Sequence, residues 1–167
     1  MEYDRMLAEL FEEEDRARQM ATRLAQIAET SHEAAIGERQ SLLAFLRGAM
    51  ERHFVYEEEH IFPQLEAHDL GPEVQVAIKQ HEAIRERAAL LAAAGPSDEL
   101  GPLIIEIAKL MHHHTNFEGD YIYPELTHGE WRELMRETVR RVAEGDQRTG
   151  PPSSVKATRG GGSAPDS

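Results

Sequence analysis

One short pattern of histidine, glutamate, isoleucine and proline occurs twice in this sequence. The first copy reads His53-Phe54-Val55-Tyr56-Glu57, then His60-Ile61-Phe62-Pro63 after two further residues. The second copy reads His114-Thr115-Asn116-Phe117-Glu118, then Tyr121-Ile122-Tyr123-Pro124. In each copy the histidine and the glutamate are four residues apart, which on a helix places them on one face, one turn apart. That face is otherwise apolar, so the repeat predicts two helices that point matching polar groups into a shared interior.

Apolar residues recur at steps of three and four along four stretches, which is the periodicity of an amphipathic helix. These stretches are residues 7–28, 43–61, 74–91 and 103–121. A break is predicted around residues 31–37, and Gly-Pro pairs at 71–72, 95–96 and 101–102 mark the ends of helices. Four long helices joined by short loops predict an all-α fold, an antiparallel up-down-up-down four-helix bundle.

A shorter amphipathic segment follows Gly129 and predicts a fifth helix that covers one side or end of the bundle. Its apolar face consists of Trp131, Leu134, Met135 and Val142. We therefore expect residues 1–144 to form one domain, a four-helix bundle with an appended short helix. Residues 145–167 are rich in Gly, Pro and Ser and offer little apolar surface to bury, which predicts a disordered tail.

Composition excludes several classes of function. The sequence has no cysteine, so any metal site must use nitrogen and oxygen ligands, and thiolate zinc sites and iron–sulfur clusters are excluded. The formal net charge is -13, which disfavours binding to the phosphates of nucleic acid. No apolar run is long enough to span a membrane and the acidic N-terminus lacks the features of a signal peptide, so we expect a soluble, cytoplasmic protein.

Polar residues interrupt all four apolar stretches at one level of the predicted core. The residues around Glu14 in the first stretch match those around His81 in the third, position by position. Together with the repeat, this predicts one buried cluster of Glu14, His53, Glu57, His81, His114 and Glu118. Buried carboxylates are costly unless cations compensate them, so we expect the cluster to bind two metal ions. Imidazole and carboxylate ligands in a helix bundle suit iron, with manganese as the nearest competitor.

At these residues the sequence resembles the hemerythrin-like family, which is built on the HHE cation-binding domain. The resemblance covers roughly residues 7–124, and its most specific elements are the two His-x-x-x-Glu motifs, each followed by a proline. It implies a centre of two iron ions, oxo- or hydroxo-bridged when oxidised. The implied roles are bridging ligands for Glu57 and Glu118, terminal ligands for His53 and His114, and a third-helix ligand for His81.

Two positions depart from the pattern of this family. Glu14 stands where the family usually has a first-helix histidine, which adds a third carboxylate and favours the ferric state. Arg85 stands where oxygen-carrying hemerythrins have a further third-helix histidine, one turn after the first. Both departures favour turnover or sensing over reversible oxygen carriage.

His60 and Tyr121 are equivalent positions of the repeat, one turn beyond the expected bridging glutamates. They are our candidate catalytic residues, as additional ligands, hydrogen-bond donors to the ligands or proton relays; ordinary packing with one hydrogen bond is the alternative for each. Tyr56 is expected to fill volume beside the core, and Met50 and Met111 to form apolar walls. The remaining histidines, at positions 32, 68, 112, 113 and 128, are expected at the surface.

A reduced two-iron site with an open position binds dioxygen or peroxide directly, so chemistry with an oxygen species is the central functional hypothesis. It covers oxidase, peroxidase or catalase-like activity, and the family resemblance adds nitric oxide and its products as ligands. Two alternatives fit the same residues, namely an oxygen- or iron-binding sensor or storage module without turnover and a di-iron oxygenase acting on a small organic substrate. The sequence does not identify a protein partner, and a metal-free bundle is the simplest competing explanation.

Overall fold

The computed structural model describes residues 2–95 and 98–145, and within these residues the regular secondary structure is helical, without a strand. This confirms the predicted all-α class. The elements are α1 (Glu2–Thr30), α2 (His32–Gly37), α3 (Arg39–Phe45), η1 (Leu46–Met50), α4 (Glu51–Tyr56), η2 (Glu57–Ile61), α5 (Phe62–Glu66), α6 (Gly71–Ala93), α7 (Leu100–Tyr121), α8 (Tyr123–Thr127) and α9 (Gly129–Gly145), with η1 and η2 being π-helical turns. None of the described helices combines the length and the apolarity that a membrane crossing requires.

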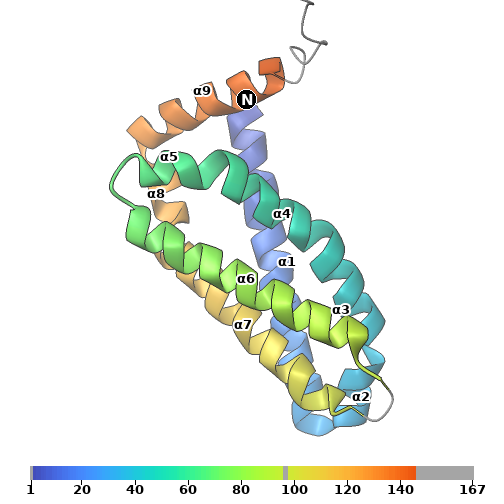
Figure 1. Ribbon diagram of the computed structural model, residues 1–167. Helices are drawn as coiled ribbons and strands as arrows, with labels where there is room; N and C mark the ends of the chain where they lie inside the picture. Colours follow the sequence, from blue (N-terminus) through green and yellow to red (C-terminus); the bar gives the residue numbers. More distant parts are fainter. Residues whose placement is uncertain (1, 96–97, 146–167) are drawn as a thin grey trace, which may run out of the picture.

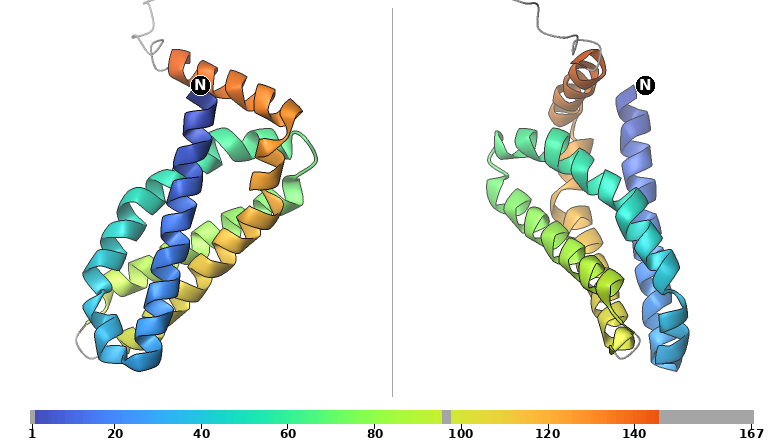
Figure 2. Two further views of the ribbon diagram at one scale, coloured as in Figure 1. Left: turned by 180° about the vertical axis from the view of Figure 1, so that it is seen from behind. Right: turned by 45° about the vertical axis from the view of Figure 1, so that its right-hand side comes forward.

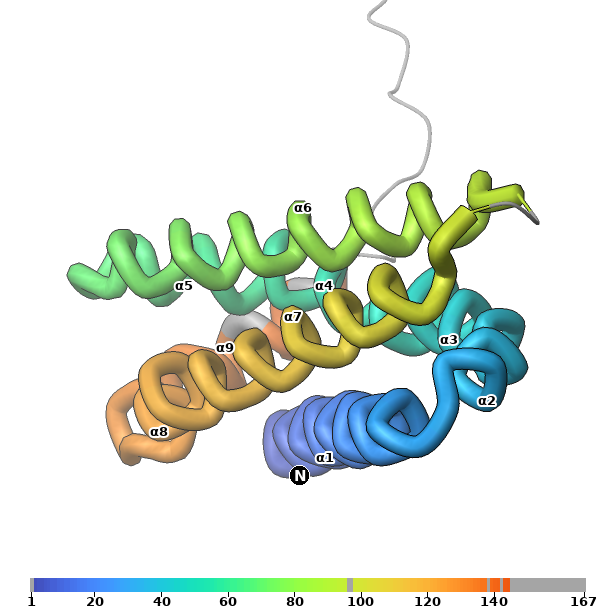
Figure 3. The backbone as a smooth tube through the Cα atoms, turned by 90° about the horizontal axis from the view of Figure 1, so that it is seen from below, coloured from blue at the N-terminus to red at the C-terminus, as the bar shows by residue number. Residues whose placement is uncertain are grey.

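In the described part of the chain, four long segments pack lengthwise around the core, with α3 to α5 forming one continuous segment (Figures 1 and 2). Helix α7 contacts both α1 and α6, and the view from below shows it between them (Figure 3). Helix α9 crosses one end of the molecule, where it contacts α1 and α8, and α2 turns the chain at the opposite end (Figure 1).

The break predicted at residues 31–37 contains the short helix α2. Ser31 begins this helix, because its side-chain oxygen accepts a hydrogen bond from the backbone N–H of Ala34. Helix α2 packs against both α1 and α7. The sequence predicted only a break here, whereas the structure has a six-residue helix that closes this end of the molecule.

Both copies of the sequence repeat bend at the same point. Proline cannot donate a backbone hydrogen bond, and its ring crowds the carbonyl group four residues earlier. Before Pro63 the helix widens into the π-turn η2, and before Pro124 α7 ends and α8 begins. The backbone angles agree closely, with φ −98° and ψ −55° at Ile61, and φ −104° and ψ −59° at Ile122. The sequence repeat is thus also a repeat of backbone structure.

Two apolar clusters fill the core and lie on either side of the layer of predicted ligands. The cluster toward α2 includes Leu24, Leu42, Leu91 and Ile104, and the cluster toward α9 includes Leu7, Leu65, Val74 and Leu126. The buried polar residues lie between the two clusters. Met135 of α9 is 2% exposed and belongs to the second cluster, against which Trp131 also packs. Helix α9 therefore covers one end, as expected; the side chain of Val142 and the predicted tail beyond Gly145 lie outside the described residues.

We predict that Ile104→Ala lowers the free energy of unfolding by about 2–5 kcal/mol, because Ile104 is fully buried in the cluster toward α2. Urea denaturation of the metal-free protein measures this change. The matched control is Leu90→Ala on α6, since Leu90 is 50% exposed and its loss should change the stability by less than about 0.5 kcal/mol. Equal losses in the two variants would contradict the assigned core.

Candidate metal centre

The structure brings all six predicted ligands into one buried layer. Glu14 comes from α1, His53 and Glu57 from the α4–η2 junction, His81 from α6, and His114 and Glu118 from α7. Each of these side chains is at most 4% exposed. Glu14 lies in an acidic run of the sequence, yet the helical phase turns it inward and leaves the rest of the run toward the surface.

The ligand atoms form two groups that could each hold a metal ion. One group consists of Glu57, His81, His114 and Glu118, and the other of Glu14, His53, Glu57 and Glu118. Within each group the ligand atoms lie within 4.8 Å of one another. The two glutamates of the repeat belong to both groups, which is the arrangement that a pair of bridged ions requires.

The two oxygens of Glu57 face different halves of the cluster. Its Oε1 lies 3.0 Å from Nε2 of His53, and its Oε2 lies 3.3 Å from Nε2 of His81. Glu118 Oε1 lies 3.5 Å from Nε2 of His81 and 3.3 Å from Nε2 of His114. Glu14 Oε1 is 3.1 Å from Nε2 of His53 and so completes the second group.

Several polar atoms of this layer are buried without a hydrogen-bond partner. They are both carboxylate oxygens of Glu14, both of Glu118, Oε2 of Glu57, and Nε2 of His81 and His114. Unsatisfied buried polar atoms are rare in folded proteins, and each costs about 1–3 kcal/mol. Apart from Nε of Arg39 and Oε2 of Glu73, the unsatisfied side-chain atoms found in the described residues all belong to the two donor groups, so a bound cation would satisfy these together. The residues present therefore fit a metal ion.

Each histidine of the layer is held from outside by a hydrogen bond at Nδ1. The acceptors are Glu13 for His53 at 2.6 Å, Glu58 for His81 at 2.7 Å and Gln80 for His114 at 3.1 Å. A proton on Nδ1 leaves the lone pair of Nε2 directed toward the centre, which is the state in which imidazole binds a metal. Sequence analysis missed these acceptors, although each directly precedes or follows a predicted ligand.

Arg85 holds one of these acceptors in place. Its guanidinium donates to Glu58 at 2.8 Å and to Glu51 at 2.9 Å. Arg85, which stands where oxygen-carrying hemerythrins have a histidine, therefore lies outside the metal layer. Its role here is to orient Glu58, the hydrogen-bond acceptor of His81.

The structure does not place His60 and Tyr121 at the centre. Tyr121 is 55% exposed, and the His60 ring packs against Tyr56 with a centroid distance of 5.0 Å. Both residues precede the bend, which lies at Ile61 and Ile122, and the position two residues later, beyond the bend, is the one that turns inward. In the second copy that position is Tyr123, whose hydroxyl donates to Glu57 Oε1 at 2.7 Å and lies 3.3 Å from Nε2 of His53.

Two surface hollows reach the cluster from opposite sides of α1. A cleft of about 430 Å³ between α1 and α7 is lined by Phe11, Glu12, Glu14, Asp15, Arg18, Thr115, Gly119 and Tyr123. A smaller groove between α1 and α4 is lined by Met6, Glu9, Leu10, Glu13, Arg52, His53 and Tyr56. Glu14 and His53 are thus the ligands nearest to the surface.

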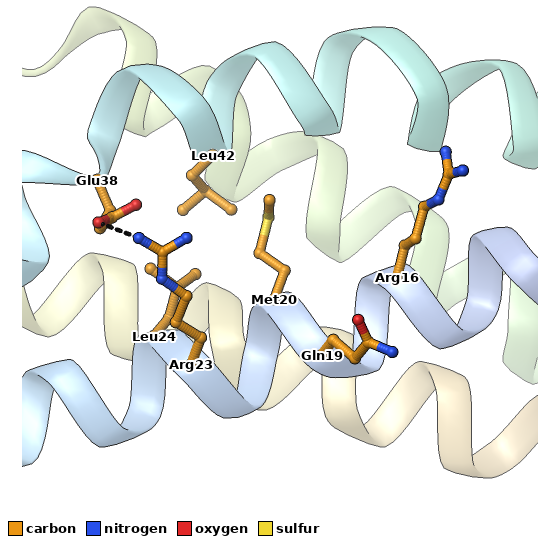
Figure 4. Close-up of a pocket in the computed structure, with 7 residues that line it drawn as sticks. All are labelled: Arg16, Gln19, Met20, Arg23, Leu24, Glu38 and Leu42. Atoms are coloured by element: carbon orange, nitrogen blue, oxygen red, sulfur yellow. Dashed lines mark hydrogen bonds and ion pairs between the residues drawn. The ribbon is translucent and has the colours of Figure 1, made fainter.

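A third hollow lies farther along α1, between α1 and α3 (Figure 4). Its lining includes Met20, Leu24 and Leu42, and its rim carries the ion pair between Arg23 and Glu38 at 2.7 Å. None of the six clustered residues lines it. Arg16 and Gln19 also line it, and among the described residues it brings no group of possible metal ligands together.

A family model described as the hemerythrin HHE cation-binding domain matches residues 5–126. The chain belongs to this family. A search of curated proteins and a search of solved structures returned no match. All six clustered residues of the hemerythrin domain lie inside the matched range, and the cation-binding description of the family agrees with their buried, unsatisfied ligand atoms.

Within the hemerythrin domain, the buried ligands differ in how readily they hold a proton. Burial would lower the pKa of His53, but the carboxylates of Glu57, Glu13 and Glu14 together outweigh burial and raise it far above its ordinary value. Against burial, the neighbouring carboxylates of Glu118, Glu57 and Glu58 raise the pKa of His81 to about 10. Burial and the nearby charge of His81 lower the pKa of His114 to about 3. Burial, reinforced by Glu57, raises the pKa of the Glu118 carboxyl group.

We predict that metal binding to the hemerythrin domain releases protons and strengthens as the pH rises from about 6 to about 9. Because the pKa values of His53 and His81 are raised, both rings carry protons at neutral pH that an incoming ion must displace. Calorimetric titration with Mn²⁺ in two buffers of different ionisation enthalpy measures the released protons. Identical apparent enthalpies in the two buffers, with affinity independent of pH, would contradict this prediction.

We also predict that Glu58→Ala weakens metal binding by about 10–100-fold, because His81 loses the acceptor that fixes its orientation. Competition with a chelator measures the affinity. The control is Glu59→Ala at the next position, whose side chain is 64% exposed and should leave the affinity unchanged. Equal affinities for the two variants would show that the acceptor has no influence on the site.

Proposed function

We propose that this chain is an antiparallel up-down-up-down four-helix bundle that binds two iron ions and reacts with dioxygen or hydrogen peroxide. The reaction is of the oxidase, peroxidase or catalase-like type, and nitric oxide species are further small ligands of the same centre. The observation that carries the proposal is the pair of donor groups sharing Glu57 and Glu118. We retain the expectation of a cytoplasmic location.

In this proposal each ion has four protein ligands. Glu57 and Glu118 would be shared by both ions. His81 and His114 would be the remaining ligands of one ion, and Glu14 and His53 would be those of the other. When bound, iron would exchange two electrons with an oxygen species, and in the catalase-like reaction one peroxide is reduced to water while a second is oxidised to dioxygen, so no other reductant is consumed. Four protein ligands leave room for a small molecule at an ion that prefers a higher coordination number.

Tyr123 supplies a fixed proton at the edge of the cluster. Its hydroxyl group donates to Glu57 at 2.7 Å, and its ring lines the cleft between α1 and α7. Burial, with the charge of Glu57, raises the pKa of Tyr123 well above its ordinary value, so the hydroxyl stays protonated at neutral pH. A molecule that enters the cleft would meet this donor beside the ligand Glu14.

The lining of the cleft favours a small, uncharged molecule. Its charged groups are Glu12, Glu14, Asp15 and Arg18, and Arg18 is partly neutralised by Asp15 at 3.1 Å. Such a rim repels anions, whereas dioxygen and hydrogen peroxide carry no charge at neutral pH. Met50 and Met111, both at most 1% exposed, close the apolar side of the layer and limit the entry of water.

We predict that the iron-loaded protein consumes many equivalents of hydrogen peroxide, and that Glu57→Ala or Glu118→Ala lowers this rate by at least about 100-fold. Each substitution removes a carboxylate that both ions would share. The measurements are iron content per chain and the initial rate of peroxide loss. Glu59→Ala is the control, because Glu59 lies beside the repeat motif with its side chain mostly in solvent.

The outcomes separate this proposal from its alternatives. Peroxide consumption that stops after one equivalent per centre would contradict the enzyme and favour a storage or sensing module. Iron content unaffected by Glu57→Ala and Glu118→Ala would contradict the site itself.

A further inference from the structure

The two donor groups differ in the ligands that they do not share. One position, which we call the imidazole half, has His81 and His114. The other, the carboxylate half, has Glu14 and His53. With the two shared glutamates included, the imidazole half has two nitrogen ligands and two carboxylate ligands. The carboxylate half has one nitrogen ligand and three carboxylate ligands. Carboxylate ligands favour harder ions such as Mn²⁺, and imidazole favours iron and later transition metals.

The imidazole half is enclosed by aromatic rings. Phe54 stacks on His81 with a centroid distance of 3.8 Å and meets the edge of His114 at 5.2 Å. Phe62 lies against the His81 ring at 5.6 Å. Neither histidine lines the cleft or the groove beside α1. An ion in this half would have to displace packed aromatic side chains to leave.

The carboxylate half lies beside surface hollows on both sides of α1. Glu14 lines the cleft between α1 and α7, and His53 lines the groove between α1 and α4. Glu13, which orients His53, is itself part of that groove, and its side chain is 33% exposed. Glu14 and His53 are themselves at most 4% exposed, so the two hollows and the partly exposed Glu13 are the route by which water and chelators would reach this half.

We propose that the imidazole half retains its ion, whereas the carboxylate half exchanges its ion with the medium and accepts Mn²⁺ in place of iron. The domain would then hold one permanent iron and one replaceable ion, and the replaceable ion would follow metal availability. This inference rests on the proposed function only in treating the cluster as a two-metal site. The ligand sets and the access routes both assign the exchangeable position to Glu14.

The test is a metal-exchange experiment on the full chain. The protein is loaded anaerobically with two equivalents of Fe²⁺, transferred to excess Mn²⁺, and sampled over time for iron and manganese per chain, with bound Mn²⁺ followed by electron paramagnetic resonance. We expect one iron to be replaced in a fast phase and the second to remain, with rates that differ by at least about tenfold. A single phase in which both irons leave, or no manganese uptake, would overturn the inference.

Two variants locate the exchangeable position. Glu14→His gives both halves two nitrogen and two carboxylate ligands, so the fast replacement by Mn²⁺ should slow at least about tenfold. Glu12→His is the matched control, because Glu12 lines the same cleft but does not belong to either donor group, and it should exchange like the wild type. Unchanged exchange in Glu14→His would overturn the assignment to the carboxylate half.

Failure of this inference is distinguishable from failure of the proposed function. A protein that binds two irons, turns over peroxide and exchanges both ions together would contradict only the inference. Two-phase exchange without peroxide turnover would support the inference and contradict the proposed enzyme. Absence of stoichiometric iron binding would contradict both.

Discussion

Three carboxylates buried among apolar side chains are the constraint on which the rest of the structure depends. Each would cost several kcal/mol in an interior that offered no compensating charge. Glu14, Glu57 and Glu118 face three imidazole rings, and most of their oxygens have no hydrogen-bond partner. Protons can supply part of the missing positive charge, as the raised pKa values of His53 and His81 indicate, and metal ions can supply all of it.

The fold maintains this layer by surrounding it on both sides. Apolar clusters toward α2 and toward α9 hold the long segments together and exclude water. Hydrogen bonds at Nδ1 then fix the direction of each ring, and the ion pairs of Arg85 tie α6 to α4 around Glu58. On one side of the layer Phe54 packs against His81, and on the other side Glu14 lines the cleft beside α1. The two donor groups therefore have different surroundings.

Helical periodicity was sufficient to identify the residues of the layer, including Glu14 within an acidic run, because burial repeats every three to four residues on a regular helix. It did not identify Tyr123, because this residue lies beyond the bend before Pro124, where the period of α7 no longer applies. The Nδ1 acceptors were missed for a different reason. Contacts such as Glu58 with His81 depend on the distance between two helices, which the period of one helix does not specify.

The most direct test of the central claim is the location of the metal in crystals of the iron-loaded protein, from anomalous diffraction on both sides of the iron absorption edge. We predict two peaks in each chain, both contacted by Glu57 and Glu118, one also by His81 and His114 and the other by Glu14 and His53. A single peak, or iron bound only outside this layer, would contradict the account.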